Sequence, residues 1–149
     1  MDPPAKKAAK PSTAKTNKPK TNPPPSPLTV SWSSLPTWQR DNAHIHTGYR
    51  PARASLTHSL ASLTYLHNES VNIHTHLFGS LLAFLSGSYV YGFVLKPRYE
   101  EYADEQDVRV FAAFFGGATV CLGVSAGYHC LASYSEGVEG WGNRGDYLG

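Results

Sequence analysis

The sequence has little cysteine and no early apolar stretch. Its two cysteines, Cys121 and Cys130, lie in one apolar segment. That placement suggests no disulfide geometry, so it says little about the redox compartment, and we interpret both as packing residues. The first apolar stretch begins only near residue 71, after a start rich in Lys and Pro. We therefore expect no secretory signal peptide.

Lys, Arg, Asp and Glu are absent from two long segments, Leu77 to Leu95 and Val110 to Ala132. A helix rises about 1.5 Å per residue, so even the shorter segment covers about 28 Å, close to the hydrocarbon thickness of a bilayer. The alternative is a soluble protein with two buried core helices, but uncharged runs of this length are uncommon there. The sequence predicts an all-α membrane protein with transmembrane helices over residues 71–95 and 108–132.

The first 28 residues carry six lysines, many prolines and almost no large apolar side chain. Such a composition cannot bury enough apolar surface to offset the entropy of ordering, so we predict a disordered tail. Attraction to an anionic membrane surface or to nucleic acid is one interpretation. We favour a solvated cytosolic tail that helps to set topology, and we expect no nucleic-acid partner.

The charge distribution predicts an orientation. Residues 1–70 hold nine Lys or Arg against three Asp or Glu, whereas residues 96–109 hold three against five. Positive residues are retained on the cytosolic side of a membrane. We expect a cytosolic amino terminus, a non-cytosolic loop over 96–107 and a cytosolic stretch over 133–149, in the endoplasmic reticulum or plasma membrane.

Residues 29–70 form a cytosolic segment that leads into the first span, here called the lead-in segment. Within it, residues 53–67 place leucines at helical spacing, with Ser, Thr and His between them. This pattern indicates a short amphipathic helix on the membrane surface. The leucines are Leu56, Leu60, Leu63 and Leu66.

The second apolar segment is rich in small residues, with Gly123 and Gly127 four positions apart. Such spacing lets helix backbones approach closely in lipid. It predicts helix–helix association through this face.

Two polar residues lie inside the second apolar segment, Ser125 and His129. They are four residues apart and share one helix face. An ionisable group at membrane depth is costly. We therefore favour a functional role for His129, facing a cavity or a metal, over the alternative of a hydrogen-bonded histidine near a helix end. One His cannot make a zinc site. His74 and His76 point about 200° apart on a helix and cannot share an ion, whereas Asp146 could return toward His129 through a turn.

Several motifs together resemble the progestin and adipoQ receptor family, also called the haemolysin III family. The lead-in segment carries Leu35-Pro36-x-Trp38 and Gly48-Tyr49-Arg50-Pro51, and residues 67–79 are similar to the family's H-x-E-x-x-N-I-x-T-H-L-x-G signature. Residues 125–129 are similar to its S-x-x-x-H motif, and residues 145–149 to its D-Y-x-G motif. The resemblance covers residues 35–149.

The resemblance implies a seven-helix bundle, of which this chain would supply two transmembrane helices and the start of a third. It implies a Zn²⁺ ion held by His129 and by two histidines of a last helix that this sequence does not contain. Ser125 and Asp146 would lie near the metal-bound water, with Asp146 as proton acceptor. The chemistry implied is hydrolysis of a lipid amide of the ceramide type, so the expected ligand is a membrane lipid or lipid-like molecule.

Two alternatives remain open. Family members also resemble receptors for protein or steroid ligands and proteins of zinc and lipid homeostasis, in which zinc would be structural. The chain as written, with one His and one Asp, would be an inactive truncated fragment with an incomplete zinc site.

Overall fold

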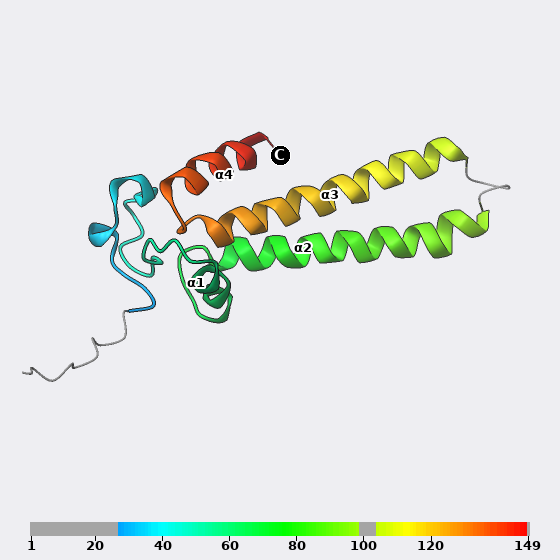
Figure 1. Ribbon diagram of the computed structural model, residues 1–149. Helices are drawn as coiled ribbons and strands as arrows, with labels where there is room; N and C mark the ends of the chain where they lie inside the picture. The colour runs from blue at the N-terminus through cyan, green and yellow to red at the C-terminus, as the bar shows by residue number, and fades with distance from the viewer. Residues whose placement is uncertain (1–26, 99–103, 149) are drawn as a thin grey trace, which may run out of the picture.

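The computed structural model describes residues 27–98 and 104–148, and of residues 146–148 only the backbone. Apart from its last two residues, the predicted disordered tail lies outside this range. Figure 1 shows two long helices, α2 and α3, side by side, with α1 and the lead-in segment gathered at one end and α4 turned back along α3. The helices are α1 (Leu56–Ala61), α2 (Ser70–Tyr89), α3 (Glu105–Leu131) and α4 (Glu136–Leu148).

Short turns complete the described part of the chain. A π-helical stretch, Val90–Leu95, prolongs α2 and ends in a 3-10 turn, Lys96–Arg98. Three further 3-10 turns lie in the lead-in segment, and an isolated antiparallel bridge joins Val30 to Tyr49. The 3-10 turns are Trp32–Ser34, Thr37–Gln39 and Ser62–Thr64.

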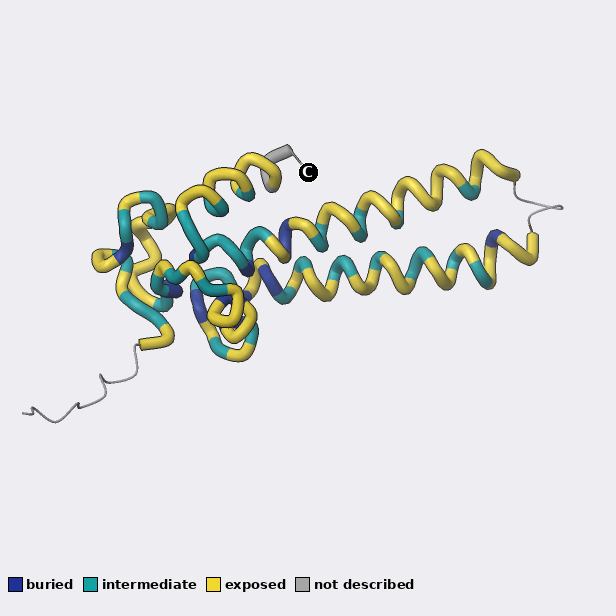
Figure 2. Tube along the Cα trace, viewed as in Figure 1, coloured by how far each residue is buried: buried dark blue, intermediate teal, exposed yellow. Residues whose placement is uncertain are grey.

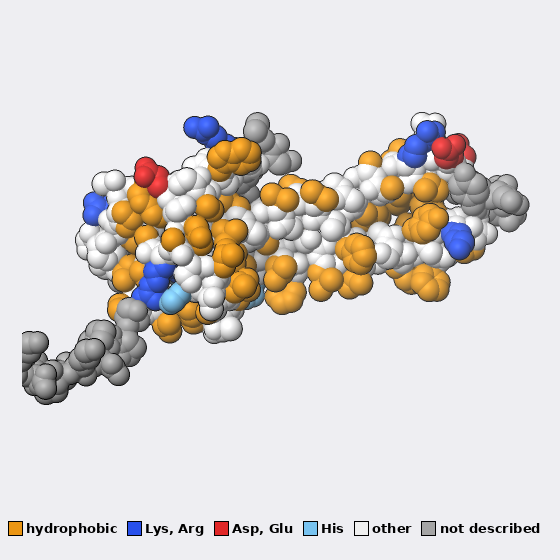
Figure 3. All heavy atoms as spheres, in the orientation of Figure 1, with side chains coloured by type: hydrophobic (Ala, Val, Ile, Leu, Met, Phe, Trp, Pro, Cys, Tyr) orange, Lys and Arg blue, Asp and Glu red, His pale blue; other side chains and the backbone are white. Residues whose placement is uncertain are grey.

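The two long helices have the length and composition of membrane spans. The continuous helical path of the first runs over Ser70–Arg98, and the second is α3. None of the most apolar stretch of the first helix is buried, and only 11% of that of the second. Helices in the core of a soluble protein would be buried on most sides. Figure 2 shows instead that exposed positions recur along both helices, and Figure 3 shows apolar side chains along the same surface, with charged groups near its ends.

A capping box fixes the start of α3. The Asp104 carboxylate accepts the backbone N–H groups of Gln106 at 2.8 Å and Asp107 at 2.9 Å, and the Asp107 carboxylate accepts the N–H of Asp104 at 3.0 Å. These bonds satisfy donors that have no partner within the helix. The helix therefore begins at Glu105, three residues before the start that hydropathy suggested.

Small residues let α2 and α3 pack closely. A Cβ atom at Gly87 would lie 2.7 Å from Cβ of Phe115, and one at Gly123 would lie 3.2 Å from Oγ of Ser80. The Ser80 hydroxyl donates to the backbone carbonyl of Thr119 at 2.7 Å. Close backbone approach and an interhelical hydrogen bond are the usual means of helix association in lipid.

The two glycines of the predicted association face have different surroundings. Gly123 contacts α2 through Ser80, whereas no described atom outside the adjoining part of α3 lies within 4 Å of the Cβ position of Gly127. Gly123 therefore belongs to the packing within this chain. Association with another chain through these glycines stays a prediction.

The amphipathic helix of the lead-in segment is shorter than the leucine spacing suggested. It consists of α1 and the 3-10 turn Ser62–Thr64, and the backbone is extended at Tyr65. Ser59 and Ser62 face inward, with 2% and 0% of their surface exposed, whereas Leu56 and Leu60 are about 60% exposed. The small serines let α1 approach the end of α3, and the leucines cover its outer side.

Candidate polar site at the junction of the two spans

The lead-in segment is tied to the ends of the two spans. The N–H of Arg53 donates to the carbonyl of Ser133, just after α3, at 3.1 Å, and within the lead-in segment Val30 and Tyr49 exchange backbone hydrogen bonds of 2.7 and 3.1 Å. Gly48 has a φ of +85°, which permits the turn that brings Arg50 inward. The region where the lead-in segment meets the start of α2 and the end of α3 is called the junction below.

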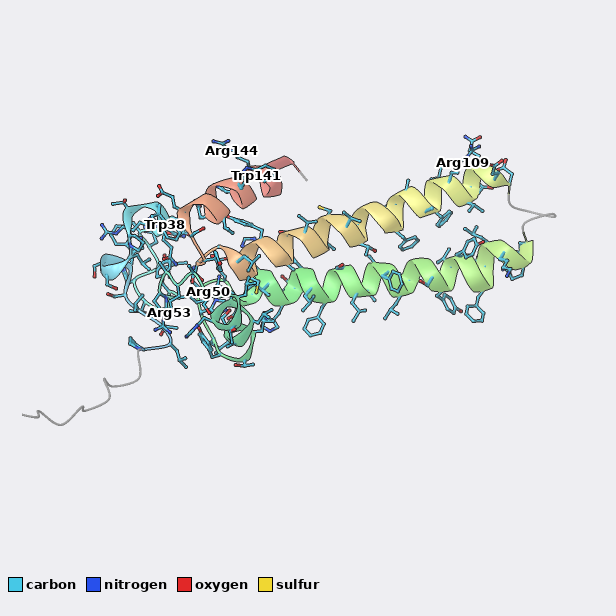
Figure 4. The ribbon with its side chains drawn as sticks, viewed as in Figure 1. Trp38, Arg50, Arg53, Arg109, Trp141 and Arg144 are labelled. Carbon is cyan, nitrogen blue, oxygen red and sulfur yellow. The ribbon has the colours of Figure 1, made fainter. Side chains whose placement is uncertain are left out.

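Arg50 connects the junction to the end of α3. It is only 3% exposed, and in Figure 4 it lies between the lead-in segment and the near end of the helix pair, whereas Arg109 lies at the opposite end. Its guanidinium donates to the carbonyl of Cys130 at 2.7 Å, to the carbonyl of His129 and to the Ser62 hydroxyl at 3.1 Å. A cation that satisfies the last carbonyls of a helix also complements its dipole.

The burial of Arg50 changes the pKa of its guanidinium. Burial lowers the pKa of the guanidinium from its ordinary value, and the nearby Glu69 carboxylate opposes that effect. Arginine nevertheless stays protonated in proteins. The junction therefore contains a buried positive charge beside Glu69.

Glu69 and His129 form a side-chain contact across the junction. Oε2 of Glu69 lies 2.8 Å from Nδ1 of His129, and both side chains are 15% exposed. Burial by itself would raise the pKa of the Glu69 carboxyl, but its hydrogen bonds with His129 and Asn72 and the charge of Arg50 hold it below the ordinary value. The carboxylate is therefore ionised at neutral pH.

Ser125 and His76 form a second polar contact, one turn deeper between the helices. Nδ1 of His76 lies 2.9 Å from Oγ of Ser125. The rings of His76 and His129 are edge to face, with 5.9 Å between their centroids. Polar side chains from α2 and α3 thus continue from the junction into the spans.

A polar cavity of about 580 Å³ opens at the junction. Arg50, Glu69 and His129 line it, together with residues of the lead-in segment and of α4. The first turns of α4 add Glu139, whose pKa is raised by burial and by the Asp41 carboxylate. The cavity therefore presents one buried cation, several carboxylates and an imidazole.

The sequence predicted three residues for this site. The structure places Ser125 and His129 on one face of α3, turned toward α2, with Glu69 and His76 as neighbours. Asp146 lies in α4 by its backbone, and its side chain falls outside the described part of the chain.

The described residues are compatible with part of the ligand set of a zinc site. An imidazole whose Nδ1 contacts a carboxylate is the arrangement that zinc-binding histidines have in proteins. Among the side chains of residues 27–98 and 104–145, however, no three of His, Cys, Asp and Glu are grouped to hold a metal ion. A complete site needs donors from elsewhere.

The residue-by-residue analysis of the sequence missed three members of the site. Glu69 and His76 belong to the signature at residues 67–79, and Arg50 to the Gly48–Pro51 motif, so the motifs contained them without assigning them roles. The angular argument that separates His74 from His76 is consistent with the structure: Nδ1 of His74 lies 2.8 Å from the carbonyl of Ser70 on its own helix, while His76 faces α3. Only the packing of the helices reveals which histidine faces the site.

Comparison with known proteins finds related sequences over most of the chain. Residues 64–149 match the model of the family described as haemolysin-III related. The chain is 40% identical over 121 residues to the ADIPOR-like receptor IZH2 of Saccharomyces cerevisiae, which covers 80% of this chain and 37% of the relative. It is 38% identical over 118 residues to the adiponectin receptor protein of Drosophila melanogaster, with 79% of this chain and 26% of the relative covered.

A third relative has similar coverage. The progestin and adipoQ receptor-like protein 1 of Caenorhabditis elegans is 33% identical over 120 residues, 80% of this chain and 26% of its own length. The chain thus spans between about a quarter and two fifths of these curated relatives. With its matching signature and two membrane spans, it belongs to the haemolysin-III related family of membrane proteins.

Proposed function

We propose that this chain forms the cytosolic, metal-binding end of a zinc-dependent membrane hydrolase whose substrate is a lipid amide of the ceramide type. The observation that carries the proposal is the placement of His129. A histidine near the end of a membrane span lies in a polar cavity, paired with a carboxylate, where an anchoring helix would need no polar group.

Each residue has a proposed task. His129 supplies one zinc ligand, and Ser125, whose hydroxyl contacts His76, lies one turn away on the same face. Asp146, in α4, is the proposed proton acceptor. Zinc held there would lower the pKa of a bound water to about 7 and polarise an amide carbonyl. A carboxylate within hydrogen-bonding reach of that water would then take up its proton.

The proposed orientation places the junction in the cytosol. The basic lead-in segment and tail precede the first span, and the acidic stretch 96–109 lies at the other end of the hairpin. The proposed membrane is the endoplasmic reticulum or the plasma membrane. Trypsin added to sealed, cytosolic-side-out vesicles should remove the Lys-rich tail. A tail protected until the vesicles are lysed would contradict this orientation.

A receptor with structural zinc is the second candidate. The observation that favours it is the naming of relatives: those of yeast and fly are named as receptors and that of the nematode as a receptor-like protein. In that case the same residues would hold a metal that stabilises the bundle, and no amide would be cleaved.

The complete gene product distinguishes these candidates. Purified in detergent with ceramide as substrate, it should contain zinc and release sphingoid base. Asp146→Asn should abolish release while zinc content stays, and His129→Ala should reduce both. Asn143→Asp, which adds a carboxylate one turn away, is the matched control and should not restore activity to Asp146→Asn. Zinc-loaded protein without release supports the receptor, and full activity in Asp146→Asn refutes the proposed proton acceptor.

The 149-residue chain alone should hold negligible zinc, because one imidazole supplies too few of the ligands that a stable site requires. Metal analysis of the purified monomer tests this expectation. Tightly held, stoichiometric zinc would contradict it.

A further inference from the structure

Glu69 is a member of the signature at residues 67–79 to which the proposed hydrolysis gives no task. It is nevertheless the carboxylate that contacts the proposed zinc ligand, with 2.8 Å between its Oε2 and Nδ1 of His129. Both side chains are largely buried. The contact joins the first residue before α2 to the last turns of α3, sixty positions later in the chain.

Residues close to Glu69 in the chain fix the position of its carboxylate. Nδ2 of Asn68 donates to Oε1 at 2.9 Å, and Nδ2 of Asn72 donates to Oε2 at 3.0 Å. The backbone is fixed as well, because the N–H of Glu69 donates to Nδ1 of His67 at 3.1 Å and its carbonyl accepts the N–H of Ile73 at 3.0 Å. The carboxylate therefore has a defined position before it meets His129.

Arg50 fixes the position of the His129 backbone. Arg50, buried in the junction, donates to the carbonyls of His129 and Cys130. The end of α3 is thus fixed relative to the lead-in segment, and the remaining freedom of His129 is rotation of its side chain. The contact with Glu69 limits that rotation.

The chemistry of the contact determines the tautomer of the ring. An ionised carboxylate only accepts hydrogen bonds, so it stabilises the proton on Nδ1, and the lone pair of the neutral ring is then on Nε2. Zinc-binding histidines are commonly held in this way by a carboxylate, which orients the ring and raises the basicity of the ligand nitrogen.

We propose that Glu69 is a positioning residue for His129: it holds the imidazole in the Nδ1–H tautomer and so directs Nε2 to the metal. The metal part rests on the proposed function, whereas the tautomer and the orientation do not. Two experiments separate these parts.

The first experiment reads the tautomer in the 149-residue chain without metal. Histidine labelled with ¹⁵N is incorporated, and the chain is studied by NMR in detergent micelles at pH 8.5, about two units above the ordinary pKa of imidazole. The His129 signals are identified by their loss in His129→Asn. We expect the Nδ1–H tautomer in the wild type and a shift toward Nε2–H in Glu69→Ala. Glu105→Ala is the matched control, since Glu105 is 72% exposed and pairs with Arg109.

The second experiment measures zinc affinity in the complete gene product by competition with a chelator. Loss of a carboxylate that supports a metal ligand typically weakens affinity about 10- to 100-fold, and we expect a loss in this range for Glu69→Ala. Glu69→Gln, which keeps the shape and one acceptor oxygen, should fall between Glu69→Ala and the wild type. Glu105→Ala should equal the wild type. Helix content from circular dichroism verifies that each variant is folded.

The outcomes distinguish the two proposals. A His129 tautomer that is Nε2–H in the wild type, or that is the same in wild type and Glu69→Ala, overturns the positioning role. Equal zinc affinity in wild type and folded Glu69→Ala also overturns it. If the complete product binds no zinc while the tautomer changes as expected, the proposed metal chemistry fails and the orienting contact stands.

Discussion

Replacing Arg50 with Met should loosen the lead-in segment from the two spans. Met preserves most of the aliphatic volume but removes the guanidinium that donates to Ser62 and to the carbonyls of His129 and Cys130. Because these acceptors come from α3 and from the turn after α1, the loss affects docking between elements rather than either span by itself.

The magnitude follows from three hydrogen bonds with a charged donor. Each contributes about 1.5–3 kcal/mol, so the gross loss is about 4–9 kcal/mol. Removing the charge also recovers its desolvation penalty, which is several kcal/mol for a buried ion. Nε of Arg50 has no hydrogen-bond partner among the described residues, which adds to the cost of keeping the wild-type side chain buried. We therefore expect a net loss of about 2–4 kcal/mol, or about 30- to 1000-fold in the docking equilibrium.

Amide hydrogen exchange of the 149-residue chain in micelles measures this directly. The N–H of Arg53 donates to the carbonyl of Ser133, just after α3, so its protection reports whether the lead-in segment is docked on the spans. In Arg50→Met, this protection should fall by the factor given above, while amides in the middle of α3 stay protected. Arg109→Met is the control, because Arg109 is 69% exposed and its ion pair with Glu105 contributes little. Unchanged protection in Arg50→Met, equal to that of Arg109→Met, would refute the docking role.

The close approach of the spans and the burial of His67 give two further tests in the same chain. Gly87→Ala should lower the thermal stability, because the new Cβ would lie 2.7 Å from Cβ of Phe115. Gly116→Ala should leave the stability unchanged, since its Cβ position is open within the described residues. Equal losses in the two variants would contradict this packing of the spans. Burial, and then the Arg50 charge, lower the pKa of His67 to about 4 from its ordinary 6.5. The unfolded chain then binds a proton that the folded chain does not between these pH values, so stability is full above pH 6.5 and falls by up to about 3 kcal/mol as the pH drops to 4. As the pH is lowered from 7 to 4.5, the unfolding midpoint in mixed micelles should therefore decrease in the wild type, and it should decrease less in His67→Asn. Parallel plots of midpoint against pH for the two proteins would show that His67 does not cause the decline.

The spans were predictable because their signal is local. An uncharged run long enough to cross a bilayer is visible in a single window of about twenty residues, and the structure has a helix over each of the two runs. Hydropathy placed the start of α3 three residues too late. The capping box at Asp104 and Asp107 starts the helix within a charged stretch, and a hydropathy profile assigns such a stretch to a loop. The membership of the family was also predictable, because its motifs are contiguous and keep their spacing.

The partners of His129 were not predictable in the same way. Helical spacing placed Ser125 and His129 on one face, but it gave no partner for that face. Glu69 and Arg50 precede His129 by sixty and seventy-nine residues, and their contacts exist only because α2 and α3 pack antiparallel while the lead-in segment folds back onto their ends.

The sequence by itself thus determined the two spans, the family and the polar face of the second span, because each depends on residues close together in the chain. The tertiary structure decided which side chains meet that face. The rotation of each helix about its axis turns His76 toward α3, while His74 contacts its own helix, and the docking of the lead-in segment buries Arg50 and aligns Glu69 with His129. Those rotations are fixed by packing between helices, through small residues such as Gly87 and Gly123, and no local pattern specifies them.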